Sequence, residues 1–540
     1  MQGTGNLPHP GLPNLPTVAQ IGNEFILFEN YACIDCHGHT SDKQRLLRCQ
    51  NDRPWHIPHL SADSRKRAVP ATQVTIVTIQ FLFTNLFKKL FIAVSAHTDS
   101  IRIQLGRGPR QVRQLVDSLG LSQPTISRAI NALGDEVVRI GNGPSIQYAL
   151  RDTRRGIGEI PVFRVSAEGT ILQLGTLIPV RPDGFVMLQS DGKTLHSDSL
   201  PWWLYDMRPQ GYLGRNYAAR HAAMLGLPNQ LNDWDDAHAL RALLVHGFDA
   251  IGNLLLGESA RNAFLSSPPG NPISQSDKQS AYIQFAEDSA RGEVPGSSAG
   301  GEQPKFVSYV QTPDGPRHVI VKFTLVEDNP VTERWRDLLL AEHLALDTLN
   351  EEGISAVRTR VMDFGSQRFL EVERFDRVGE LGRRGLFSMK ALDAEFVGAG
   401  AAGWSVIAHS LAKEGHISPE SAASASLLQA FGVLIGNTDM HTGNLSFVSE
   451  HGRPYELAPA YDMLPMGFAP KSGGGIPSTL LDATIHADIP PEVWIRAEEL
   501  AQRYLSKLRS EQGFSQAFQP CIDALAHHIA GAASKIARLG

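Results

Sequence analysis

Hydrophobic residues recur with helical spacing from about Thr98 onward, and they fit three short helices. The second helix would cover Pro109 to Ser118. The third would begin at Ser122 with Pro124 in its first turn, where proline is tolerated. Six apolar side chains fall at spacings that close a small core: Leu115, Leu119, Leu121, Ile126, Ile130 and Leu133. The stretch "EVVRIGNGPSIQYALRD" then fits two strands around a Gly-Asn-Gly turn, so the patterns together predict a winged helix-turn-helix over residues 96–155.

The third helix of this module carries polar and basic side chains that suit a DNA major groove. Its candidate DNA-binding residues are Gln123, Thr125, Ser127 and Arg128. Arginines in the module provide the local positive charge that phosphate contacts need: Arg107, Arg110, Arg113, Arg128 and Arg139. Helix-turn-helix modules also serve as protein contacts, so a purely structural role is the alternative. Because the formal net charge of the chain is −6, DNA contact would be confined to this module.

Alternation of apolar and polar residues from Ile160 to about Leu200 predicts an antiparallel sheet. Helical spacing follows in "RNYAARHAAML" and "DDAHALRALLVHG". Beyond a loop, "PKFVSYV" and "RHVIVKFT" predict paired strands, and the second strand carries Lys322 among β-branched residues. Nearer the C-terminus an apolar helix, Leu427 to Ile435, is predicted to break at Gly436.

Residues 1–95 show no sustained period and are rich in Pro, His and Arg, which indicates a poorly ordered extension or a start site assigned too far upstream. "CIDCH" matches a haem-attachment pattern, but no secretory signal precedes it, so chance or a metal contact is the preferred interpretation. Residues 74–96 are apolar, yet Lys88 and Lys89 shorten the run below the roughly 20 residues of a spanning helix. With 42% hydrophobic residues and four cysteines, we expect a globular cytoplasmic protein without a membrane partner.

The stretch "GNTDMHTGNLSF" places several polar side chains directly after the apolar helix. Asp439 and Asn444 have the spacing of a protein-kinase catalytic loop, in which the acid accepts the substrate hydroxyl proton and the amide binds Mg²⁺. Asp462 would be the second metal ligand, while Lys322 and a glycine-rich turn at residues 296–301 would contact phosphates. Each residue alone has a structural alternative as a cap or a loop residue. Their order along the chain predicts a phosphoryl-transfer site.

The stretch "MDFG", Met362 to Gly365, spells the metal motif of protein kinases but precedes the catalytic loop instead of following it. We therefore interpret it as a turn between strands and prefer Asp462 as the metal ligand.

At these residues the chain resembles the HipA-type serine/threonine kinases, the toxin components of bacterial toxin–antitoxin systems. The resemblance covers roughly Ile160 to the C-terminus and rests on "SSAGGEQPKF", "VIVKF", "VERFDR", "IGNTDMHTGN" and "APAYDM" in this order. It implies ATP and Mg²⁺ as cofactors, Asp439 and Lys322 as catalytic residues, and Asn444 and Asp462 as metal ligands. It also implies that a further set of residues contacts the nucleotide: Gly300, Gly301, Gln303, Lys305, Lys322, Glu373, Phe375 and His441.

The family regulates itself by phosphorylating a serine in the glycine-rich loop, and both Ser297 and Ser298 fit that position. A phosphate there adds about two negative charges where the ATP phosphates must lie, so inhibition is physically reasonable. The fused helix-turn-helix departs from typical members, whose DNA-binding function belongs to a separate antitoxin, and resembles a YjjJ-like subgroup. Our hypothesis is that the fusion makes the kinase its own operator-binding repressor or replaces part of an antitoxin.

The expected fold class is therefore α+β. We expect a two-lobed HipA/protein-kinase-like fold, with a β-rich N-terminal lobe over residues 156–377 and an all-α C-terminal lobe over residues 378–540, preceded by the winged helix-turn-helix. The expected reaction transfers the γ-phosphate of ATP to a Ser or Thr hydroxyl, on the chain itself and on a protein substrate. In the family such substrates include aminoacyl-tRNA synthetases. The alternatives are a nucleotide-sensing transcriptional regulator with an inactive kinase fold, and a small-molecule kinase.

Overall fold

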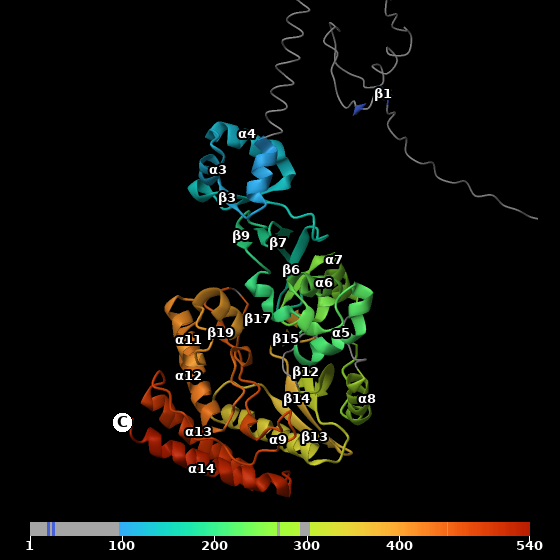
Figure 1. Ribbon diagram of the computed structural model, residues 1–540. Helices are drawn as coiled ribbons and strands as arrows, with labels where there is room; N and C mark the ends of the chain where they lie inside the picture. The colour runs from blue at the N-terminus through green and yellow to red at the C-terminus, as the bar shows by residue number, and fades with distance from the viewer. Residues whose placement is uncertain are drawn as a thin grey trace, which may run out of the picture. The chain divides into compact units, whose positions relative to one another are not determined.

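The computed structural model of this chain describes residues 19–21, 24–26, 97–266, 270–291, 303–450 and 452–539 (Figure 1). Strands β1 (Ala19–Ile21) and β2 (Glu24–Ile26) form an antiparallel pair. The rest of the expected extension, 1–95, lies outside the described residues, as does the apolar segment 74–96. In the described ranges, no helix is both long enough and apolar enough to cross a membrane.

The region from residue 97 to residue 150 consists of three helices and a three-stranded sheet. A helix that ends at Leu105 is followed by α3 (Val112–Leu119) and α4 (Gln123–Leu133). Helix α3 begins at Val112 instead of Pro109, because the preceding residues form β3 (Arg110–Gln111). The sheet is completed by the antiparallel strands β4 (Val137–Ile140) and β5 (Gln147–Leu150), in the order β3-β5-β4. The core of this region is formed by apolar side chains of the three helices and of β5.

A five-stranded antiparallel sheet follows, in the order β10-β6-β7-β8-β9. Its strands are β6 (Ile160–Val165), β7 (Ile171–Pro179), β8 (Phe185–Gln189), β9 (Thr194–Ser197) and β10 (Leu254–Leu256). The antiparallel sheet expected between Ile160 and Leu200 is confirmed, and β10 joins its edge from later in the chain. The helices of this region are α5 (Gly211–Leu225), α6 (Asp236–His246) and α7 (Gly257–Ser266).

The next sheet positions the candidate site. Four antiparallel strands, β11 (Lys305–Thr312), β12 (Gly315–Phe323), β13 (Thr359–Phe364) and β14 (Gln367–Glu373), lie in the order β11-β12-β14-β13. One face packs against α8 (Lys278–Ala290) through aromatic side chains, and the other packs against α9 (Pro330–Glu351). Because successive strand residues point to opposite faces, Val321 and Phe323 face α8 while Lys322 and Leu370 face α9.

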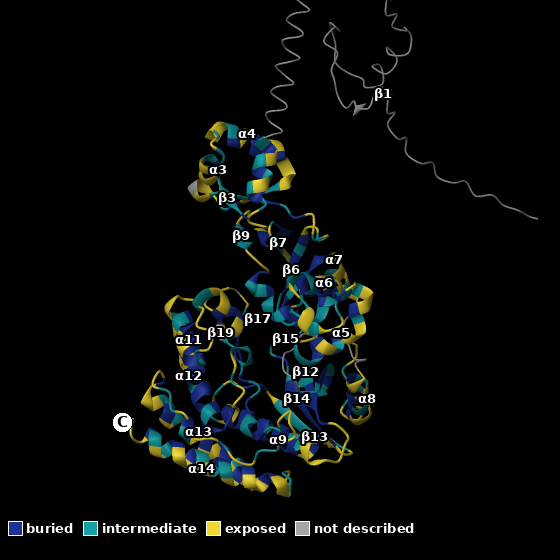
Figure 2. Cartoon of the chain, viewed as in Figure 1, coloured by how far each residue is buried: buried dark blue, intermediate teal, exposed yellow. Residues whose placement is uncertain are grey.

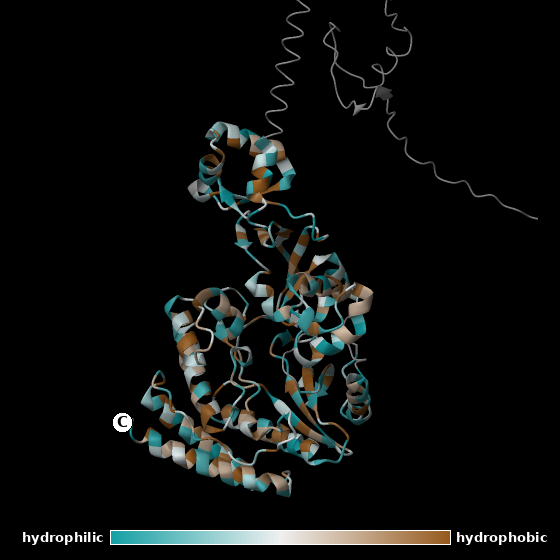
Figure 3. Cartoon of the chain, in the orientation of Figure 1, coloured by the Kyte–Doolittle hydropathy of each residue, from teal (hydrophilic) through white to brown (hydrophobic). Residues whose placement is uncertain are grey.

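The C-terminal region is mainly helical. Its helices are α10 (Met389–Leu392), α11 (Trp404–Lys413), α12 (Pro419–Leu434), α13 (Pro491–Ser510) and α14 (Gln519–Ile536). Their buried positions form one continuous core with the inner side of α9 (Figure 2). Many buried residues of α12 and of the sheet strands are hydrophobic, but Gln429 on α12 and Lys322 on β12 are buried polar residues (Figure 3). The N-terminal cap of α12 is the buried Ser418, whose hydroxyl accepts from the amide of Ser421, as its position before Pro419 favours.

The expectation that residues 378–540 are entirely helical is wrong. Strands β17 (Gly385–Ser388), β18 (Ser446–Ser449) and β19 (Glu456–Leu457) form a three-stranded sheet, and β15 (Arg377–Val378) pairs with β16 (Gly382–Arg383). The reason is that β18 follows directly on the polar stretch at Asp439 to Asn444 and pairs with a segment far away in sequence, Phe447 lying opposite Phe387. Such short strands have no local periodicity strong enough to predict.

Candidate active site

Lys322 is the buried cation of the site. Its side chain faces α9 from β12, and the residue is only 6% exposed. The ammonium donates to both carboxylate oxygens of Glu342, with Nζ 2.6 Å from Oε1 and 2.8 Å from Oε2, and it donates to Asp462 as well. Burial lowers the pKa of Lys322, but the charges of Asp462 and Glu342 outweigh burial and raise this pKa above its ordinary value. The lysine is therefore held in its charged form between the two carboxylates.

Glu342 was not singled out from the sequence. It lies on α9 within the apolar stretch "LLLAEHLAL" and is fully buried. Burial raises the pKa of its carboxyl, while Lys322 opposes that shift. The sequence feature that could have indicated Glu342 is a glutamate on the apolar face of a helix, because a glutamate is rarely buried without a cationic partner.

Asn437 ties the polar loop to Asp462. Helix α12 ends before Gly436, whose φ of 74° favours glycine. Directly after it, the buried side chain of Asn437 accepts from the backbone amide of Asp439 at 3.0 Å and donates to the backbone carbonyl of Asp462 at 3.3 Å. This second unpredicted residue therefore joins two segments that are distant in sequence.

Asp439 lies on the exposed loop after Gly436. Desolvation raises the pKa of its carboxyl above the ordinary value, the neighbouring charge of Asp462 adds to that effect, and His441 opposes it. Asn444 donates its side-chain amide to the backbone carbonyl of Asp439 at 2.8 Å, which leaves its amide oxygen as the group that could accept a cation. The ring of His441 accepts from the amide of Gly443 at 3.0 Å, so this histidine also shapes the loop.

Asp462 has a backbone conformation that side chains rarely adopt, with φ at 52°. Burial alone would raise the pKa of its carboxyl, but Lys322 and then Lys305 hold it below the ordinary value. The carboxylate is therefore ionised beside Lys322. A strained aspartate that keeps its charge at the meeting point of two segments is typical of a functional site.

The other expected nucleotide-contacting residues differ in what surrounds them. Lys305 is buried opposite Lys322 in the register of β11 and β12. Phe375 lies beside Tyr461, with ring centroids 5.7 Å apart, and so reaches the neighbour of Asp462. Within the described chain, the side-chain nitrogen of Gln303 is buried without a hydrogen-bond partner. Glu373 ends β14, and Arg317 lies 3.9 Å from its carboxylate.

Four of the expected site residues lie outside the described residues. They are the glycine-rich-loop positions Ser297, Ser298, Gly300 and Gly301.

The "MDFG" stretch is a turn between strands, as predicted. Phe364 ends β13, Gly365 has a φ of 61°, and β14 begins at Gln367. The carboxylate of Asp363 is held by Arg368, with Nε 2.8 Å from Oδ1.

The expected DNA-binding residues lie on α4. Gln123, Ser127 and Arg128 are exposed, and the hydroxyl of Thr125 lies 2.9 Å from that of Ser122. This surface is therefore available for a contact.

Comparison with known proteins identifies the class of this chain. A family model described as a HipA-like C-terminal domain matches residues 297–530, and one described as the middle domain of a YjjJ-like toxin matches residues 157–265. The curated protein Toxin YjjJ from Escherichia coli (strain K12) is 36% identical over 436 residues, which cover 80% of this chain and 98% of that protein. The chain therefore belongs to the HipA-type kinase toxin family, within its YjjJ-like group.

Two solved structures show weaker overall similarity. One is the HipA–HipB–operator DNA complex of the toxin–antitoxin system of Shewanella oneidensis MR-1, with 17% identity and a TM-score of 0.45 over 70% of this chain and 97% of that chain. The other is CtkA, a proinflammatory kinase from Helicobacter pylori, with 14% identity and a TM-score of 0.33 over 45% of this chain and 94% of that chain.

Proposed function

We propose that this chain is an ATP-dependent serine/threonine protein kinase. The observation that carries the proposal is the buried contact of Lys322 with Glu342 and Asp462. In protein kinases, a strand lysine paired with a helix glutamate and an aspartate that binds metal must both be in place for phosphoryl transfer. Here the strand is β12, the helix is α9, and Asp462 is held next to the polar loop that follows α12.

Each polar residue has a role in this proposal. Asp439 accepts the proton of the attacking hydroxyl, and its raised pKa brings it closer to the pH at which a general base works best. Lys322 contacts phosphate oxygens. Asn444 and Asp462 fit Mg²⁺, because one amide oxygen and one ionised carboxylate are hard oxygen donors and such sites usually take their other ligands from phosphates and water. Bound Mg²⁺ would neutralise charge that develops on the transferred phosphoryl group.

The nucleotide would lie between the four-stranded sheet β11-β12-β14-β13 and the mainly helical C-terminal region. We assign its contacts to Gly300, Gly301, Gln303, Lys305, Glu373, Phe375 and His441, with Ser297 or Ser298 as the site of inhibitory autophosphorylation. The buried, unpartnered nitrogen of Gln303, in the described part of the chain, supports a polar ligand beside β11. We also propose four parts for the chain: an extension over 1–95, a winged helix-turn-helix over 96–155, and lobes over 156–377 and 378–540.

The substrate would be a Ser or Thr hydroxyl of another protein, for which an aminoacyl-tRNA synthetase is a candidate, and an antitoxin would be a further partner. The phosphorylation test uses purified protein with Mg²⁺ and labelled ATP, and maps the label by mass spectrometry. Asp439→Gln should abolish labelling of Ser297 or Ser298 because the base is lost, whereas Asp363→Asn, in the unrelated "MDFG" turn, should leave it intact. Absence of label in freshly dephosphorylated protein that binds ATP would instead support a nucleotide-sensing regulator.

A second proposed activity is DNA binding through the winged helix-turn-helix. It is supported by the exposure of Gln123, Ser127 and Arg128 on α4. Arg128→Ala should weaken binding to the DNA upstream of the coding region and reduce the salt dependence of the affinity, because it removes a basic contact. The measurement is a fluorescence-anisotropy titration at several salt concentrations. Equal binding by a chain that lacks residues 1–155 would contradict this assignment.

A further inference from the structure

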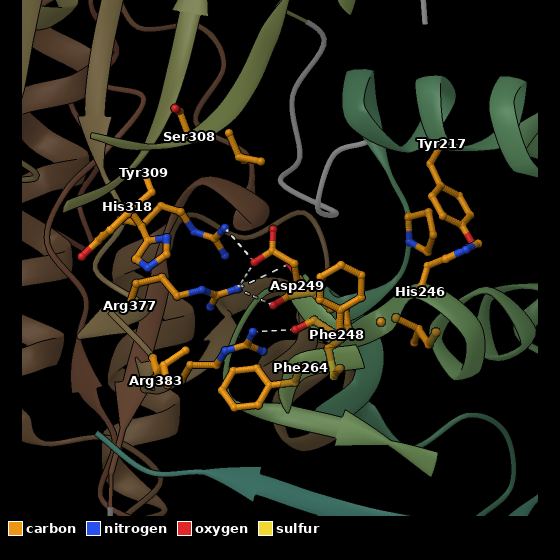
Figure 4. A pocket seen from close by; sticks show the side chains of 18 of the residues that line it. Tyr217, His246, Phe248, Asp249, Phe264, Ser308, Tyr309, His318, Arg377 and Arg383 are labelled. Atoms are coloured by element: carbon orange, nitrogen blue, oxygen red, sulfur yellow. Dashed lines mark hydrogen bonds and ion pairs between the residues drawn. The ribbon is translucent and has the colours of Figure 1, made fainter. Parts of the chain in front are cut away.

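A cavity of about 610 Å³ lies apart from the candidate active site (Figure 4). It opens between the helices α5 and α6 on one side and the strands β11 and β12 on the other. Its aromatic lining includes Tyr217, His246, Phe264 and Tyr309. The described residues that line it do not include Lys322, Asp439, Asn444 or Asp462. A volume of this size is typical of small-molecule sites.

One wall of the cavity carries Asp249, Arg374, Arg377 and Arg383. Together with Asp376, which pairs with two of these arginines, they form a group of charges that we call the arginine cluster. Arg374 and Arg377 share the two carboxylates. The Arg374 guanidinium holds Asp376 at 2.9 Å and the Arg377 guanidinium holds Asp249 at 2.9 Å. The three guanidiniums of the cluster face only two carboxylates, so the cluster carries one excess positive charge.

Arg383 is the member of the cluster that has no carboxylate partner in the described part of the chain. The residue is 5% exposed, its Nη2 donates to the backbone carbonyl of Phe248, and its guanidinium lies 4.7 Å from the centre of the Phe264 ring. Its Nη1 is buried and has no hydrogen-bond partner among the residues that the structure describes. Burial and then the charge of Arg377 lower the pKa of Arg383 well below its ordinary value, which shows the energetic cost of an unpaired cation there.

We propose that this cavity binds a small aromatic carboxylate, with Arg383 as the partner of its charge. One carboxylate would balance the excess charge of the cluster and accept from the unused Nη1. A flat ring suits the space between the aromatic side chains of the lining (Figure 4). The site lies against the segment that follows Glu373, but its occupation does not depend on kinase activity.

The test compares 2-naphthoate with 2-naphthamide, which match in shape and differ in charge. Each is titrated into the full-length protein without nucleotide, by isothermal titration calorimetry. The carboxylate should bind at least about tenfold more tightly than the amide, as a charge-assisted hydrogen bond in a buried site requires. Equal affinities, or no binding of 2-naphthoate at about 10 mM, a concentration that would saturate even a millimolar site, would overturn the proposal.

Variants locate the site. Arg383→Gln should weaken 2-naphthoate binding at least about tenfold. Its matched control, Arg384→Gln, removes the neighbouring arginine, whose partly exposed side chain holds Glu450 at 2.6 Å, and should leave the affinity unchanged. If Arg383→Gln does not fold, Ser308→Tyr, which places a ring into the cavity from β11, should abolish binding in its place.

Lys322→Met separates this proposal from the proposed kinase function. This variant should lose phosphoryl transfer and keep 2-naphthoate binding. Loss of 2-naphthoate binding in a folded Lys322→Met protein, or competition between 2-naphthoate and ATP, would place the anion in the nucleotide site and overturn the inference.

Discussion

The candidate active site and the arginine cluster bring charges together in opposite proportions. In the active site, Lys305 and Lys322 lie among the carboxylates of Glu342, Asp439 and Asp462, whose charges influence one another's pKa values. Those five groups sum to one excess negative charge, whereas the five groups of the arginine cluster sum to one excess positive charge. Because a local excess of one charge attracts the opposite charge, each site is suited to the ion that balances it. The difference suggests a cation site beside Asp462 and an anion site beside Arg383.

The largest expected effect is on the free energy of unfolding when one charged side chain is neutralised in each site. Glu342→Gln removes a carboxylate from a buried ion pair, so the free energy of unfolding should fall by about 3–5 kcal/mol. Arg383→Gln removes the excess cation, so the loss should be only about 1–2 kcal/mol, from the Phe264 contact and one hydrogen bond. Urea unfolding of both variants measures the difference. Comparable losses would mean that Arg383 is as well compensated as Glu342.

The next effect compares two aspartates: Asp462, the proposed metal ligand, and Asp363, which lies in the "MDFG" stretch. Asp462→Asn should slow phosphoryl transfer by about 10²–10³-fold, because it removes the ionised ligand of the proposed Mg²⁺ site and with it the cation that would neutralise charge on the transferred group. Asp363→Asn should change the rate less than about twofold, since the partly exposed Asp363 contacts only Arg368 in the β13–β14 hairpin, away from the candidate active site. Initial rates at saturating ATP compare them. Equal effects would remove Asp462 from the site.

A smaller effect is expected at Asn437, which positions other groups without touching substrate. Asn437→Ala should lower kcat by about tenfold, the cost of one or two lost buried hydrogen bonds, while KM for ATP changes less. Thr438→Ala, in the exposed neighbouring position, is the control. A change confined to the unfolding midpoint, with kcat preserved, would show a purely structural role.

The smallest effect is on pH dependence. A base acts only when deprotonated, so kcat/KM should decrease as the pH is lowered. Because the pKa of Asp439 is raised, the midpoint of this decrease should lie above about 3.9, the ordinary value for an aspartate. His441 opposes the raised pKa, so His441→Ala should move this acid limb to higher pH, by less than about one unit. A pH–rate profile of both proteins tests the shift. A move to lower pH would show that His441 does not act on Asp439 in this way.

Much of the fold could be predicted where the pattern is local. The paired strands around Lys322, the helix that ends before Gly436 and the turn at Gly365 all follow from periodicity and glycine position. The strands β17 to β19 could not be predicted, because their pairing joins segments about 60 residues apart, such as Phe387 and Phe447, and short strands carry little signal of their own.

The sequence by itself determined the chemical groups of the site and their order: Lys322, Asp439, Asn444 and Asp462. Local hydrogen bonding and the 3.6-residue or two-residue periods decide the elements that carry them. Only the tertiary structure decided which charges meet. Glu342 became recognisable through its contact with Lys322, Asn437 through its bonds to two segments, and Arg383 through its lack of a carboxylate partner in the described structure. The physical reason is that the energy of a buried charge depends on its neighbours in space, which sequence distance does not specify.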